Sequence, residues 1–171
     1  TNLTDQSVIV SIVIPCYNHG QYIQEALDSI DAQKINYPIE IIIVDDGSSD
    51  TDTLQKLDDL KQLNYTIIHQ TNGGPGKARN TGIEIAVGKY ILPLDADNKL
   101  RHEYIKEGAE ILDSNPNLAV VYGDLHYFGK RNQDKIIGNF DISKLLVKNY
   151  IDACIVLRKT AWDSVSGYDE K

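Results

Sequence analysis

Methionine is absent from the 171 residues of this chain, and cysteine, tryptophan and phenylalanine are rare, with two, one and two copies. Cys16 and Cys154 lie too far apart to form a zinc or redox motif, which favours two reduced thiols in a cytoplasmic protein. Because no initiator methionine is present, we expect the chain to be a processed product or a segment of a longer protein.

Positively charged residues are outnumbered by negatively charged ones, and long apolar runs are lacking. Lysine and arginine total 17 against 25 aspartates and glutamates, which gives a formal net charge of −8. Nucleic-acid backbones require clustered lysines and arginines, so this balance argues against nucleic-acid binding. No apolar stretch reaches the roughly 18 residues of a transmembrane helix, although peripheral association of the parent protein with the inner face of a membrane stays open.

The chain does contain a regular alternation of apolar runs with helical periods. Strands are expected at residues 8–15, where Pro15 would end the first one, and at 39–44, 65–69, 89–94, 118–122 and 153–157. Helices are expected at 22–33, 50–63, directly after the glycines at 73–76, and at 102–114, 142–148 and 159–165. Over 124–150 the pattern loosens. The alternation predicts an α/β protein with a mostly parallel sheet in one domain.

The strand expected at 89–94 is followed by two carboxylates, Asp95 and Asp97. Charge at the end of a buried apolar strand is unfavourable unless a cation lies nearby. Mg²⁺ and Mn²⁺ are usually held by one or two carboxylates together with substrate phosphates. We therefore predict a site for a metal-bridged diphosphate at the carboxyl edge of the sheet.

Polar side chains follow three of the predicted strands, at 15–18, 45–48 and 95–98. Ligands of open α/β sheets bind outside the carboxyl ends of the strands, so these segments would meet at one edge. Any one of them could serve only as a turn or a helix cap. Their coincidence on one edge favours a binding site.

Five ordered motifs, at 14–18, 43–50, 76–82, 90–97 and 167–170, resemble those of the family 2 glycosyltransferases. Members of that family have the GT-A fold, take an activated nucleotide-sugar and invert the configuration at the anomeric carbon. The resemblance extends from Val10 to Glu170. It implies a Rossmann-like α/β/α sandwich of three layers, with residues 1–171 as a single nucleotide-sugar-binding domain that is incomplete at its C-terminus.

The resemblance also implies roles for individual residues. Tyr17 would stack on the nucleobase, Asp46, rather than Asp45, would accept a hydrogen bond from the base N3–H, and Asn18 would brace the loop. Asp95 would reach the ribose or the metal, and Asp97 would coordinate Mn²⁺ or Mg²⁺ directly. The implied nucleotide-sugar-binding residues are Pro15, Tyr17, Asp46, Arg79, Asp95, Ala96 and Asp97, with Asp95 and Asp97 as the metal ligands.

The glycine-rich segment at 72–76 has two readings. A turn of this kind before a helix can present backbone N–H groups to a phosphate. Alternatively, its glycines only turn the chain, and Asn80 anchors a neighbouring loop. Trp162 is expected in the core because it lies at helical spacing from Val165.

An inverting transfer needs a general base that deprotonates the acceptor hydroxyl. In the resembled family this carboxylate follows the Gly-Tyr-Asp-Glu stretch, so we expect it beyond Lys171 and assign no catalytic residue within the chain. This fragment alone is therefore expected to be inactive. With its acceptor side uncovered, it is also expected either to have low stability or to form a homodimer through an exposed apolar patch.

The resemblance implies a hexosyltransferase-class enzyme of polysaccharide biosynthesis. It would move a sugar from a nucleotide-diphosphate donor, with a UDP-sugar favoured, to a saccharide or lipid-linked acceptor. A non-catalytic module that holds a nucleotide-sugar or saccharide for a larger assembly is the alternative. Nucleotidyltransferases and dinucleotide-binding dehydrogenases carry a glycine-rich loop after the first strand, which this chain lacks. No residue indicates the donor sugar or the acceptor.

Overall fold

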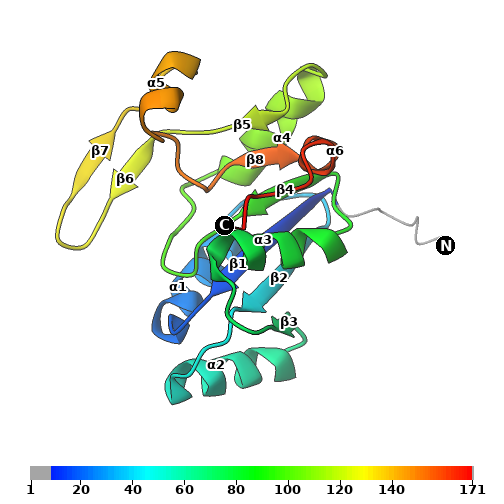
Figure 1. Cartoon of the computed structure of the whole chain (residues 1–171), viewed down its shortest axis with the longest axis vertical. Helices are drawn as coiled ribbons and strands as arrows, with labels where there is room; N and C mark the ends of the chain where they lie inside the picture. The colour runs from blue at the N-terminus through cyan, green and yellow to red at the C-terminus, as the bar shows by residue number, and fades with distance from the viewer. Residues whose placement is uncertain (1–8, 171) are drawn as a thin grey trace.

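The computed structural model describes residues 9–170 (Figure 1). The strands are β1 (Val10–Cys16), β2 (Ile39–Asp45), β3 (Thr66–His69), β4 (Tyr90–Pro93), β5 (Val120–Val121), β6 (Leu125–Tyr127), β7 (Gln133–Lys135) and β8 (Val156–Arg158). The helices are α1 (Gly20–Asp31), α2 (Thr51–Gln62), α3 (Gly74–Ile85), α4 (Tyr104–Ser114), α5 (Ile142–Val147) and α6 (Lys159–Ser164). Strands and helices alternate through the first four pairs, as the sequence predicts.

Six strands form one sheet in the order β3-β2-β1-β4-β8-β5. The first four run parallel, with β1 between β2 and β4. β8 is inserted between β4 and β5 and runs antiparallel to both. The prediction of a mostly parallel sheet is confirmed. Because parallel strands end on the same side, the loops after β1, β2, β3 and β4 share one edge.

Helices cover both faces of the sheet, which confirms the predicted three-layer sandwich. Alternate residues of a strand point to opposite faces. Ile12 and Ile14 of β1 belong to a buried cluster with residues of α1, α2 and α4. Val13 belongs to the cluster on the other face, with residues of α3 and with Trp162 of α6. Figure 1 shows α3 across the front of the sheet. Trp162 is thus packed against the core, as predicted.

Pro15 does not end the first strand, contrary to the sequence prediction. β1 continues through Pro15 to Cys16, which pairs with Asp45 of β2. The pairing of β1 with β4 ends at Val13 and Pro93. Pro15 therefore lies beyond the part of β1 that needs an N–H on the β4 side, and its missing donor breaks no ladder hydrogen bond. The predicted start of this strand at Val8 lies outside the described residues.

Residues 124–150, here called the outer lobe, project from the sheet (Figure 1). They contain a β6–β7 hairpin that sequence analysis missed, followed by the predicted short helix, α5. Several apolar side chains of the lobe are strongly exposed, among them Ile136 (80%), Leu146 (81%) and Val147 (88%). The apolar surface is present, and the dimer expected from it stays a prediction. No helix in the described stretch combines the length and apolarity needed to span a bilayer.

Candidate functional site

A cleft of about 550 Å³, the edge cleft, opens at the carboxyl ends of β2, β1 and β4. Every residue predicted to bind nucleotide-sugar lines it, although these residues come from separate segments. The lining comprises Pro15, Cys16, Tyr17, His19, Asp46, Asn72, Gly74, Pro75, Ala78, Arg79, Asp95, Ala96 and Asp97. The structure thus brings the predicted residues together, and their contacts with a ligand stay a prediction.

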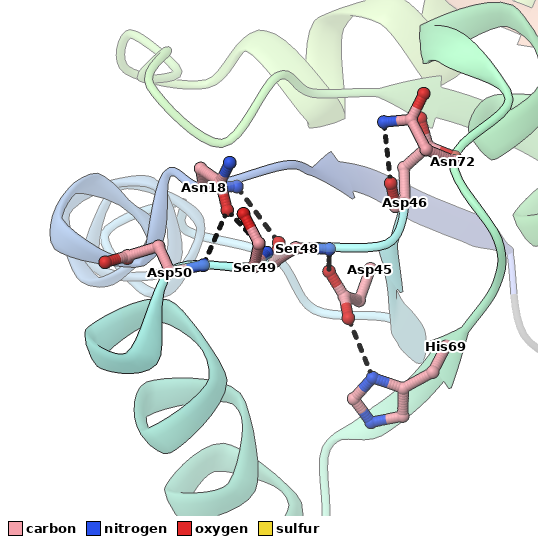
Figure 2. A network of polar contacts seen from close by, with 8 residues as sticks. All are labelled: Asn18, Asp45, Asp46, Ser48, Ser49, Asp50, His69 and Asn72. Atoms are coloured by element: carbon pink, nitrogen blue, oxygen red, sulfur yellow. Dashed lines mark hydrogen bonds and ion pairs between the residues drawn. The ribbon is translucent and has the colours of Figure 1, made fainter.

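Asn18 joins the first two loops of this edge (Figure 2). Its backbone adopts a left-handed conformation, with φ of 53°, which asparagine tolerates better than most residues. Its Oδ1 accepts hydrogen bonds from the N–H groups of Ser49 (2.9 Å) and Asp50 (3.0 Å). Its own N–H donates to Ser48 Oγ at 3.0 Å. These bonds all reach the loop after β2, so the predicted bracing role of Asn18 is confirmed.

Asp45 and Asp46 are both 3% exposed, but they have different partners. Asp45 Oδ1 accepts a hydrogen bond from the N–H of Ser48 at 3.0 Å, and its Oδ2 lies 2.9 Å from His69 Nδ1 (Figure 2). Asp46 lines the edge cleft, and Asp45 is not part of that lining. The geometry therefore favours Asp46 over Asp45 for a ligand contact, which is the choice that the sequence analysis made.

Asp46 holds the start of α3. Its Oδ1 accepts hydrogen bonds from Gln70 Nε2 (2.7 Å) and the N–H of Gly73 (2.8 Å), and its Oδ2 accepts one from the N–H of Gly74 (2.8 Å). These amides are bound by a protein carboxylate and are not directed at a phosphate. Of the two readings of the glycine-rich segment, the structure supports the turn. A carboxylate has about four acceptor positions, so Asp46 Oδ2 can accept one further hydrogen bond.

Gln70 is a site residue that sequence analysis missed. It directly follows β3, its amide nitrogen orients Asp46, and its backbone N–H donates to the carbonyl oxygen of Asp45 at 2.9 Å. Its Oε1 is buried without a hydrogen-bond partner among the described residues. A signal for it was present, because Gln70 is the polar residue at the end of a predicted strand, like those recognised after the other three.

Arg79 of α3 also lines the cleft and pairs with Asp95. Its Nη2 is 2.5 Å from Asp95 Oδ1, and its guanidinium lies 5.8 Å from the ring centroid of Tyr168. The Arg79 side chain is only 12% exposed, and its buried Nε–H lacks a partner within the described stretch. Burial raises the pKa of the Tyr168 phenol, so this ring stays neutral beside the guanidinium. Arg79 thus neutralises one of the two carboxylates after β4.

Asn80 anchors the Gly-Tyr-Asp-Glu segment at 167–170 to α3. Its Nδ2 donates to the carbonyl oxygen of Tyr168 and to Glu170 Oε1, both at 2.9 Å. Its Oδ1 accepts from the N–H of Tyr168 (2.8 Å) and from Trp162 Nε1 (3.3 Å). At Gly76 a Cβ atom would lie 2.7 Å from the carbonyl oxygen of Asp169, so only glycine allows this approach. The predicted anchoring role of Asn80 is confirmed, and it keeps Tyr168 against Arg79.

Asp97 differs from Asp95 in having no partner among residues 9–170. It is exposed at the rim of the cleft and forms no hydrogen bond or ion pair with any other described residue. Within residues 9–170, no group of three or more histidine, cysteine, aspartate or glutamate side chains could hold a metal ion by itself. A metal at this edge would therefore take one or two carboxylates from the protein and its other ligands from a bound molecule and water.

Cys16 and His19 also line the cleft without having been placed in the predicted site. Burial raises the pKa of the Cys16 thiol to about 11, so the thiol is protonated near neutral pH and is not a nucleophile. His19 packs edge-on against Tyr22, with ring centroids 5.7 Å apart. The described cleft therefore offers acidic acceptors, one buried arginine and an exposed aromatic ring, Tyr17.

Comparisons with known proteins agree with this geometry. Residues 11–163 match the model of Glycosyl transferase family 2. The chain is 34% identical over 138 residues to the glycosyltransferase GlyG of Streptococcus pneumoniae serotype 4, covering 78% of this chain and 43% of that protein. It is 35% identical over 109 residues to the poly(ribitol-phosphate) β-N-acetylglucosaminyltransferase TarS of Staphylococcus aureus, covering 60% of this chain and 18% of TarS.

The solved structures of TarS 1–349 are similar along most of the chain. The complex with UDP gives a TM-score of 0.75 at 27% identity and covers 95% of this chain and 51% of TarS 1–349. The complex with UDP-GlcNAc gives 0.74 at 25% identity. The chain spans about half the length, or less, of these relatives. The α/β sandwich is that of the GT-A fold, and the chain belongs to the family 2 glycosyltransferases.

Proposed function

We propose that residues 1–171 form one nucleotide-sugar-binding unit of a glycosyltransferase that uses a UDP-sugar as donor. The observation that carries the proposal is the lining of the edge cleft, which unites the motifs after β1, β2 and β4 with Arg79 of α3. The proposal of a UDP-sugar donor is further supported by TarS, which shares the fold and family and forms complexes with UDP and UDP-GlcNAc. In this proposal the acceptor is a saccharide or a lipid-linked saccharide.

The order of the strands gives the donor a direction in the cleft. β1 lies between β2 and β4, so Pro15 and Tyr17 lie between Asp46 on one side and Asp95 and Asp97 on the other. The nucleobase would stack on the half-exposed ring of Tyr17 and donate its N3–H to Asp46 Oδ2, which has a free acceptor position. The ribose would contact Asp95, whose second oxygen is not used by Arg79. The diphosphate would then reach Asp97.

The residues at this end fit a divalent cation. Asp97 is an exposed carboxylate that pairs with no residue of the described part of the chain, and a diphosphate placed against it without a cation would be repelled. Asp97 would hold Mn²⁺ or Mg²⁺, and Asp95 would contribute only through the oxygen that Arg79 leaves free. Such a cation supplies charge stabilisation on the leaving nucleoside diphosphate. Arg79, whose charge is paired with Asp95, would offer its buried Nε–H to a phosphate or sugar oxygen.

In this proposal the transfer inverts the configuration at the anomeric carbon, and none of the cleft residues acts as the general base. The cleft residues bind and orient the donor, and the sheet edge fixes their spacing through Asn18 and Asp46. For this reason the test is donor binding and not turnover.

Isothermal titration of the chain with UDP, GDP, TDP and CMP, with and without Mn²⁺, tests the proposal. UDP should bind most tightly, and its affinity should depend on the metal. Asp97→Asn should abolish the metal-dependent part, while the exposed helix residue change Asp58→Asn should leave it intact. If no nucleotide binds, or if GDP binds as tightly as UDP, the proposed donor is wrong.

A further inference from the structure

A second cavity, the side cavity, lies next to the edge cleft and has a volume of about 400 Å³. Three segments enclose it: 98–104 after β4, 123–128 at the start of the outer lobe, and 152–154 before β8. Its volume lies within the range of about 300–1,000 Å³ that is usual for small-molecule pockets. Its lining combines the rings of Tyr104 and Phe128 with the carboxylates of Asp124 and Asp152.

The side cavity neighbours the edge cleft on the Asp97 side. A third hollow, lined by Tyr22, Glu25, Asp97, Lys99 and Phe128, shares Asp97 with the edge cleft and Lys99 and Phe128 with the side cavity. The thiol of Cys154, inside the side cavity, provides a second link. Burial, together with the charges of Asp152 and Asp95, raises the pKa of this thiol to about 12. A molecule in the side cavity would thus lie beside the diphosphate end of a donor in the edge cleft.

The cations that line the side cavity are already paired with carboxylates. Lys99 forms an ion pair with Glu25 of α1. Arg101 Nη1 lies 3.2 Å from Asp134 Oδ1 of β7, and His126 Nδ1 lies 2.8 Å from the same oxygen. A phosphate in the cavity would have to compete with these carboxylates for each positive group.

The two carboxylates of the side cavity, in contrast, can each accept a hydrogen bond from a ligand. Asp124 Oδ1 accepts a hydrogen bond from the N–H of Ile137 (2.7 Å), and Asp152 Oδ1 accepts one from the N–H of Cys154 (2.9 Å). Neither forms an ion pair with a described residue, so the second oxygen of each is open to a ligand. Free carboxylate oxygens accept hydrogen bonds from hydroxyl groups and repel phosphates.

We propose that the side cavity binds an uncharged, hydroxyl-rich unit of the acceptor, a pyranose or a polyol, through Asp124 and Asp152. This inference rests on the proposed function, because it places the acceptor next to the donor's diphosphate end. Hydroxyl groups of the unit donate to the free oxygens of both aspartates, and its C–H face packs against the half-exposed ring of Phe128, which the Lys99 ammonium approaches to 4.7 Å from the ring centroid. The outer lobe supplies Asp124 and Phe128 and is therefore a determinant of acceptor specificity.

The test is ¹H–¹⁵N correlation NMR of the chain titrated with methyl β-D-glucopyranoside, ribitol and ribitol 5-phosphate, each with and without UDP. We expect the two uncharged probes to shift the amide signals of residues 123–128 and 152–154, and the phosphorylated probe to bind more weakly. Asp124→Asn and Asp152→Asn each keep the oxygen that binds the backbone and replace only the free one. Each should weaken binding of the uncharged probes about tenfold, whereas Asp58→Asn should not.

Two results would overturn this inference. One is tighter binding of ribitol 5-phosphate than of ribitol at these amides, which would assign a phosphate-bearing acceptor. The other is the lack of any shift at the side cavity with all three probes. UDP alone reports on the edge cleft, through the amides of Tyr17 and Asp46, so failure of the donor proposal is seen separately from failure of the acceptor proposal.

Discussion

The edge cleft and the outer lobe use polar residues in opposite ways. At the cleft, carboxylates and amides bind backbone groups of neighbouring loops, so that Asp46 in its lining, and Asn18 and Asn80 outside it, each join segments distant in sequence. In the outer lobe, the contacts with the body include the exposed ion pair Arg101–Asp134 and the cation–π contact Lys99–Phe128, and apolar residues such as Leu146 face solvent. The cleft is thus preorganised for a ligand, whereas the lobe is attached weakly enough to adapt to one.

The largest effect on the free energy of unfolding should come from Asp46→Ala, which removes the carboxylate that connects the loop after β2 to the start of α3. The change leaves the N–H groups of Gly73 and Gly74 and the Gln70 amide without their acceptor. Because unsatisfied buried donors and lost charged hydrogen bonds are each unfavourable by about 1–3 kcal/mol, we expect a stability loss of roughly 3–5 kcal/mol. Urea denaturation measures it. Asp46→Asn, which keeps one acceptor oxygen, should lose less, and equal losses would show that the carboxylate does not hold α3.

Asn80→Ala should have the second largest effect. It removes four hydrogen bonds to Trp162, Tyr168 and Glu170 and frees the segment that packs on Arg79. We expect a loss of about 2–3 kcal/mol in urea denaturation. The matched control is Asn115→Ala, since Asn115 donates a single exposed side-chain bond, to Ile111. A loss at Asn80 no larger than at Asn115 would contradict the anchoring role.

Part of the lining of the edge cleft was predicted from sequence, but the connections between its residues were not. Buried parallel strands appear as continuous apolar runs, so the ends of β1, β2 and β4 could be located, and topology places such ends on one edge. Which partner each polar residue binds depends on loop geometry. The bonds from Asp46 to Gly73 and Gly74, and from Arg79 to Asp95, could not be read from spacing, and they change which carboxylate is free for a metal.

The outer lobe was predicted poorly for a physical reason. β6 and β7 have three residues each, and β7 is the polar sequence Gln133-Asp134-Lys135, so no apolar alternation marks the hairpin. The position of β8 was predicted within a few residues, but not its direction, because a strand of three residues has no pattern that shows whether it runs antiparallel to its neighbours. Hydrophobic patterns in a sequence identify helices and strands that bury one face, and the elements of the outer lobe bury little apolar surface.

A smaller effect is expected where the outer lobe meets the body, at Asp134. The hydrogen bond with His126 and the charges of His126 and Arg101 hold the pKa of Asp134 below its ordinary value. Its stabilising contribution is therefore complete above the ordinary range of an aspartate and is lost as the pH falls through this lowered pKa. We expect amide signals of β6 and β7 to shift in that acidic range in NMR spectra, while those of α3 stay constant. Asp134→Asn should abolish the transition, and Asp163→Asn should not.

The smallest effect should come from the double change Leu146→Gln and Val147→Gln in α5. Both side chains are more than four-fifths exposed, so removing their apolar surface takes little burial away, and stability should change by less than about 0.5 kcal/mol. The same exchange at Leu27 and Ile30 of α1, which are 1% exposed, should be strongly destabilising. Urea denaturation over a range of protein concentrations measures both pairs. A concentration-dependent loss in the α5 variant would show that these residues are buried in a dimer, and the lobe would then be a partner surface and not a free one.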